Sequence, residues 1–281
     1  MATTILNPAK DSAHIFIPRE HGATAMLLTP FFAAAILLRK LYWPEFVALV
    51  AIACAFAIKD PLVVMARQRF VWKNEHPETK AARRSVLIQT LLLALCGVTL
   101  LLVRDWRAFI PLFLSAGAFT VLAVVLNVRN KQRSECFQVV SAFALSATAL
   151  TASLSAENRI PKWCWALWLL CALQAAAGIF VVHARLDARI AARKGKTVET
   201  HNRRAAFVYQ LILILAAVSL ALFGHFWIAA ALLLAAICYL AELRRQTNPA
   251  SLQMPLKRVG VEALGLSIVY ALLIVVGLWH A

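Results

Sequence analysis

The sequence predicts an all-α membrane protein, a polytopic bundle of about nine transmembrane helices with its N-terminus in the cytoplasm. Three observations lead to this fold class. Apolar runs of helix-spanning length recur along the whole chain, and a hydrocarbon core needs about 20 such residues per helix. The composition is 62% hydrophobic and only 15% charged, which leaves too little polar surface for a soluble fold. The basic residues also gather in alternate loops.

The apolar runs define the expected helices in chain order. They cover residues 22–38, 43–60, 85–103, 107–126, 136–155, 161–182, 205–223, 225–242 and 261–280. Pro30 and Pro111 lie inside the first and fourth runs, and we expect each to kink its helix. No pattern of broken, ion-coupling helices is evident. Residues 1–14 are predicted to be a flexible lead-in, and residues 15–281 a single transmembrane domain.

The distribution of charge sets the orientation. When the segments between runs are assigned alternately to two faces, one face receives 23 of the 29 Lys and Arg residues. The positive-inside rule places that face in the cytoplasm, which predicts a multi-pass protein of the cell inner membrane. Basic helix ends of this kind meet anionic lipid head groups, so the net charge of +16 does not indicate a nucleic-acid partner. The oligomeric state is not indicated.

Three ionisable residues, Arg19, Glu20 and His21, stand at the start of the first apolar run. Two interpretations stay open. The residues anchor the helix start, where Glu20 favours the helix dipole, or they turn inward and form one wall of a polar cavity. On the second interpretation Glu20 and His21 are candidate catalytic residues and Arg19 is a candidate substrate-binding residue.

Single aspartates follow two of the predicted helices. Asp60 comes directly after Lys59 at the end of the second run, and Asp187 lies four residues after His183, beyond the sixth. Such a carboxylate pairs with a neighbouring cation, accepts a proton or binds a metal ion. Magnesium normally takes several oxygen ligands together with substrate phosphate, and each loop offers one aspartate.

Cations and amides dominate the same predicted cytoplasmic helix ends. This set suits an anionic ligand such as a diphosphate or a lipid phosphate, because arginine binds oxyanions through a rigid two-pronged donor. A solvated helix end would have a similar composition. The candidate substrate-binding residues are Lys59, Arg67, Asn127, Arg129, Lys131, His183, Arg185 and Arg189.

The run from Pro18 to Pro30, PREHGATAMLLTP, resembles the opening signature of the YwiC-like family of bacterial membrane proteins. The layout more distantly resembles UbiA-type intramembrane prenyltransferases, which are nine-helix proteins with working loops after helices two and six. That resemblance implies transfer of an isoprenoid chain from its diphosphate, with Mg²⁺ held by aspartate-rich motifs. Asp60 and Asp187 stand where those motifs would lie.

The sequence departs from the prenyltransferase pattern in both loops. Val64 to Arg67 replace the downstream residues of the first motif, and arginines flank Asp187. Two functional hypotheses follow. The first is a divergent prenyltransferase-like enzyme, in which Asp60 and Asp187 hold metal or water. The second is a non-catalytic membrane protein that binds or transports a polyisoprenoid lipid or another anionic small molecule.

Overall fold

The computed structural model describes residues 21–39, 41–73, 78–132, 134–194, 200–254 and 256–279. All regular secondary structure within these ranges is helical, which confirms the all-α fold class. The chain divides into two compact units. The first comprises the described part of 42–132, and the second the described parts of 20–41 and 133–281. The prediction of one domain over 15–281 stays a prediction, and each unit is described by itself.

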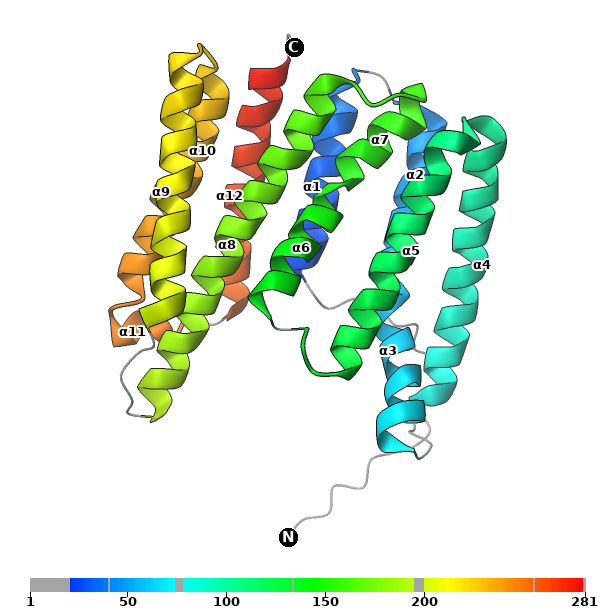
Figure 1. Cartoon of the computed structure of the whole chain (residues 1–281), viewed down its shortest axis with the longest axis horizontal. Helices are drawn as coiled ribbons and strands as arrows, with labels where there is room; N and C mark the ends of the chain where they lie inside the picture. The colour runs from blue at the N-terminus through cyan, green and yellow to red at the C-terminus, as the bar shows by residue number, and fades with distance from the viewer. Residues whose placement is uncertain are drawn as a thin grey trace. The chain divides into compact units, whose positions relative to one another are not determined.

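The first unit contains α2 (Trp43–Ala57), α3 (Lys59–Arg67), the π-helical turn η1 (Gln68–Trp72), α4 (Thr79–Val103) and α5 (Trp106–Val128). α2 packs against α4, and α3 packs against both α4 and α5 (Figure 1). α3 therefore carries its side chains to the end of α5, where the chain leaves this unit.

The second expected helix is longer than its apolar run. The chain turns at Ile58 and continues through α3 and η1 to Trp72, whereas the apolar run ends at residue 60. Pro61 is tolerated because it lies in the first turn of α3, where its missing N–H leaves no helical bond unmade. The continuation adds an amphipathic segment beyond the apolar one, and this segment presents Arg67 to α5.

The second unit contains α1 together with all helices after α5. α1 contacts α6, α7, α8 and α12, and α8 also packs against α6, α9 and α10 (Figure 1). The helices are α1 (His21–Leu37), α6 (Glu135–Ser146), α7 (Thr148–Glu157), α8 (Lys162–Lys194), α9 (Thr200–Leu222), α10 (Phe226–Arg245), α11 (Pro249–Leu252) and α12 (Leu256–Leu278).

Length and composition make the protein a multi-pass membrane protein. Within the described ranges, eight helical segments are long and apolar enough to cross a membrane, when α2–η1 and α6–α7 are each taken as one segment. The apolar part of α1, Gly22–Leu37, is shorter. Together they account for the nine predicted runs.

One predicted span is interrupted. The run 136–155 forms two helices, α6 and α7, which meet at Ala147. At this point Thr148 donates its hydroxyl hydrogen to the backbone oxygen of Leu27 in α1, at 2.7 Å. The sequence analysis did not anticipate a broken helix, since the break contains neither Gly nor Pro. The hydrogen bond from Thr148 to α1 is a tertiary contact at the break between α6 and α7.

The first and last helices of the chain meet at one end of the second unit. Arg39, just after α1, donates to the backbone oxygen of Trp279 at 2.5 Å. Its guanidinium carbon also lies 4.7 Å from the centre of the Trp279 ring, a cation–π contact. The end of α1 thus lies beside the end of α12, and an odd number of spans would likewise end the first and last helices on the same side.

Candidate functional site

A contact between α3 and α5 brings together two of the predicted phosphate-binding residues. Arg67 Nη2 donates to the backbone oxygen of Asn127 at 2.9 Å and to its side-chain oxygen at 3.1 Å. The same nitrogen lies 3.0 Å from Oδ1 of Asn130, whose φ of 55° ends the helix in the left-handed region. Arg67 therefore binds one backbone oxygen and two side-chain oxygens at the end of α5.

This arrangement leaves donors available for a ligand. Only Nη2 of Arg67 has partners within the described residues, so the hydrogens on Nε and Nη1 remain free. Among the described residues, the side-chain oxygen of Asn127 has a donor, whereas its amide NH₂ group has no acceptor. Arg129 and Lys131 are exposed in the same turn and make no ion pair with the described part of the chain. Three cations and one amide thus belong to one turn and its contact with α3.

The Asp60 carboxylate lies on α3 beside a cation. Lys59 Nζ is 3.7 Å from Asp60 Oδ1, with both side chains partly buried, and the ammonium also lies 5.5 Å from the centre of the Phe56 ring. The pairing interpretation of Asp60 therefore agrees with the geometry. Asp60 and Arg67 are seven residues apart on a helix, which places them on the same face about two turns apart.

The candidate residues of α8 are tied to neighbouring helices of the second unit. Asn202 of α9 donates to Oδ2 of Asp187 at 2.5 Å. His183 Nε2 lies 3.0 Å from Oε1 of Gln138 in α6, and its Nδ1 lies 4.0 Å from a carboxylate oxygen of Glu135. These contacts hold α8 against α6 and α9 at the end where the predicted loop begins.

Arg185 is buried between three helices. Its side chain is 3% exposed and forms an ion pair with Glu242 of α10. Nη2 donates to the backbone oxygen of Ser251 in α11 at 2.7 Å. Arg185 is thus placed to pin α8, α10 and α11 together. Arg189, one turn later, is only partly buried and has no ion-pair partner within the described ranges.

The described side chains around the two aspartates do not supply the ligand set that a magnesium ion needs. Across the described residues, no three His, Cys, Asp or Glu side chains gather as potential ligands of a metal ion. Asp60 faces an ammonium and Asp187 an amide. The described residues therefore do not form a magnesium site around either aspartate.

Some predicted site residues lie outside this description, and some relevant residues were not predicted. Arg19 and Glu20 are outside the described residues, as is the lead-in 1–14, and for His21 only the backbone at the start of α1 is described. The sequence analysis missed Asn130, Asn202 and Glu242 as partners. The sequence indicates these residues only weakly. An amide or a carboxylate at a helix end has many possible partners, and the packing of the helices decides which one it contacts.

Comparison with known families gives one match. The YwiC-like protein family matches residues 17–153. Over this stretch, the chain is similar to the YwiC-like family. The predicted resemblance to that family is thereby confirmed, and the YwiC-like stretch includes both sides of the Arg67–Asn127 contact. No curated protein and no solved structure matches the chain. The resemblance to UbiA-type prenyltransferases stays a prediction.

Proposed function

We propose that this protein binds the head group of an isoprenoid or lipid phosphate in the cell inner membrane, at the predicted cytoplasmic end of α3 and α5. The contact of Arg67 with Asn127 and Asn130 carries the proposal. It holds the guanidinium through Nη2 and leaves the hydrogens of Nε and Nη1 without a partner among the described residues. Each of these N–H groups can donate a charge-assisted hydrogen bond to a phosphate oxygen.

The neighbouring charges support an anionic ligand. Arg129 and Lys131 add two exposed cations beside the remaining N–H groups of Arg67. The carboxylate nearest along α3, Asp60, is paired with Lys59, so its charge is partly compensated. A phosphate at this turn would meet cations on more than one side.

The apolar surface of α5 supports a lipid-like ligand. Val121, Leu122 and Val125 are exposed in the last turns of the helix, directly before the basic turn. A hydrocarbon chain that lies along these side chains would place a phosphate head group at Arg129 and Lys131. The polar turn and the apolar surface thus match the two parts of an amphiphilic phosphate.

Prenyl transfer from a diphosphate is the second candidate function. The position of Asp60 on the same helix face as Arg67 favours it, because a carboxylate near a bound diphosphate is what the resemblance to UbiA-type enzymes implies. The ion pair between Asp60 and Lys59 favours a protein that binds the ligand without a reaction, because the carboxylate already has a cation as its partner. Binding therefore stands first.

The experiment is a binding measurement that separates the two candidates. Purified full-length protein in nanodiscs is titrated with fluorescent farnesyl phosphate and farnesyl diphosphate, in MgCl₂ or in EDTA. A binding protein is expected to take both ligands equally in the two buffers. A transferase is expected to prefer the diphosphate with magnesium. The absence of saturable binding of either ligand in both buffers would overturn both candidates.

A further inference from the structure

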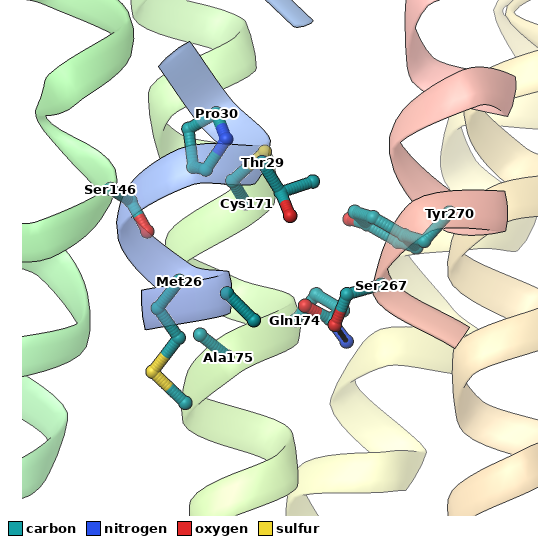
Figure 2. A pocket seen from close by; sticks show the side chains of 10 residues that line it. Met26, Thr29, Pro30, Ser146, Cys171, Gln174, Ala175, Ser267 and Tyr270 are labelled. Carbon is teal, nitrogen blue, oxygen red and sulfur yellow. Dashed lines mark hydrogen bonds between the residues drawn. The ribbon is translucent and has the colours of Figure 1, made fainter. Parts of the chain in front are cut away.

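A small cavity with a mixed polar and apolar lining lies inside the second unit, between α1, α6, α8 and α12 (Figure 2). Its volume is about 20 Å³, which is enough for one water-sized guest. We call it the α1–α8 cavity and define it by its polar lining residues, Thr29, Ser146, Gln174, Ser267 and Tyr270. Polar residues within spans usually serve a function, because each costs free energy in an apolar surrounding.

The Ser146 hydroxyl has no hydrogen-bond partner among the described residues. Its side chain is 1% exposed and its oxygen is fully buried, yet it lines the cavity (Figure 2). A buried polar atom without a partner costs roughly 1–3 kcal/mol. Ser146 therefore points to a guest that supplies the missing interaction.

Two other hydroxyls direct their hydrogens away from the cavity. Tyr270 donates to the backbone oxygen of Leu170 in α8 at 2.9 Å. Ser267 donates to the backbone oxygen four residues earlier in α12, at 3.0 Å. Each oxygen retains lone pairs, but its hydrogen is used. These two residues thus offer oxygens that accept hydrogen bonds or coordinate a cation.

Gln174 follows the same pattern. Its Nε2 donates to the hydroxyl of Tyr239 at 2.8 Å and to Ser267 Oγ at 3.2 Å. Both amide hydrogens are therefore used. The amide oxygen has no donor among the described residues. Thr29 also makes no side-chain hydrogen bond there, so its oxygen is available as well.

The cavity lies beside two irregular helices. Pro30 in α1 has no N–H, so the backbone oxygen of Met26, another lining residue, lacks its helical donor. α6 ends at Ser146 and α7 begins at Thr148, so the cavity also borders the break between these two helices. In membrane proteins, unwound carbonyls and the C-terminal ends of broken helices are places where Na⁺ is coordinated.

We propose that the α1–α8 cavity binds a monovalent cation of the size of Na⁺. The lining offers several neutral oxygens and no carboxylate, which is too little negative charge for a divalent ion. One water molecule would pair with up to four of these polar groups, as a donor to two and an acceptor from two, whereas a cation interacts with all the oxygens at once. The site is separate from the proposed head-group site, because its residues belong to the second unit and those of the head-group site to the first.

The test is a thermal melt of the full chain in detergent, with NaCl compared with choline chloride at equal ionic strength. Cation binding to the folded state is expected to raise the Tm in NaCl by about 2–4 °C. Ser146→Ala and Thr29→Val should abolish that rise. Ser141→Ala is the matched control, because Ser141 lies on the same helix and its hydroxyl is bonded to the oxygen of Phe137.

The Tm in choline chloride shows whether each variant still folds. Ser146→Ala should match or exceed the wild type there, since the change removes an unpaired buried group. An equal wild-type Tm in both salts would overturn the proposal and leave a buried water as the occupant. A sodium-dependent rise of the same size in Ser146→Ala and Thr29→Val would overturn it too.

Discussion

Arg67 and Asn127, sixty residues apart in the chain, are joined by two hydrogen bonds from one guanidinium nitrogen, at 2.9 and 3.1 Å. The contact closes the end of α5 against α3 and fixes the turn that carries Arg129 and Lys131. Since Nη2 alone makes these bonds, one residue both stabilises the turn and retains donors toward a ligand. Arg67 therefore has both a structural role and a role in the proposed function.

Replacing Arg67 should weaken the packing of α5 on α3. Arg67→Gln removes bonds to three oxygens, and hydrogen bonds to a charged group contribute about 1.5–3 kcal/mol. We expect a Tm clearly below that of the wild type. Arg69→Gln is the matched control, because Arg69 is exposed two residues later. Equal melting temperatures for the two variants would show that the contact contributes nothing.

Breaking the buried ion pair between α8 and α10 should destabilise the protein more than the loss of the Arg67 contact. Arg185→Met leaves the Glu242 carboxylate without its cation, and removal of one partner of a buried pair costs about 3–5 kcal/mol. Arg189→Met, one turn away and unpaired within the described residues, should stay near wild type. The measurement is the yield of monodisperse protein after heating. Adding Glu242→Gln to Arg185→Met should recover part of the loss, and no recovery would contradict the pairing.

Two glycines of α12 should respond differently to alanine. A Cβ at Gly277 would lie 2.8 Å from Ile228 Cγ1 and 3.3 Å from the Ile228 backbone nitrogen in α10, whereas a Cβ at Gly265 meets nothing within 4 Å. Overpacking costs about 1–3 kcal/mol. Gly277→Ala should therefore lower the Tm while Gly265→Ala leaves it unchanged or raises it. The same Tm for both variants would mean that α10 and α12 pack differently.

The orientation predicts where reporters are active. Alkaline phosphatase, which works only outside the cytoplasm, should be active when fused after Arg104 or Arg159. It should be inactive when fused after Lys131, at the other end of α5. An inactive fusion after Arg104, at normal expression, would reverse the predicted topology.

Much of the fold could be predicted because the local amino-acid composition identifies a membrane-spanning helix. All nine apolar runs correspond to helical segments, since an 18-residue apolar stretch has few alternatives in a membrane. The break at Ala147 could not be predicted in this way. It is stabilised by Thr148 bonding to α1, a tertiary contact spanning 121 residues, and nothing in the local sequence specifies it.

The sequence predicted which types of residue form the candidate site better than it predicted which residues contact each other. Arg67, Asn127 and Arg185 were recognised as polar residues at helix ends. Their partners depend on which helices pack together, so the chain alone could not distinguish Arg67, which keeps free donors, from Arg185, which is buried against Glu242. The sequence analysis did not identify Ser146 and Gln174, because both lie within apolar runs. A polar side chain surrounded by apolar ones in a predicted span was the feature that could have identified them.

The proposed head-group site is tested most directly by the affinity for fluorescent farnesyl phosphate in nanodiscs of uncharged lipid. The comparison is between the double variant Arg129→Gln, Lys131→Gln and the control Arg107→Gln, which removes an exposed cation at the opposite end of α5. Two exposed charges contribute together about tenfold in affinity. The double variant should bind about tenfold more weakly than wild type, and the control should bind normally. Equal affinities for all three proteins would contradict the site.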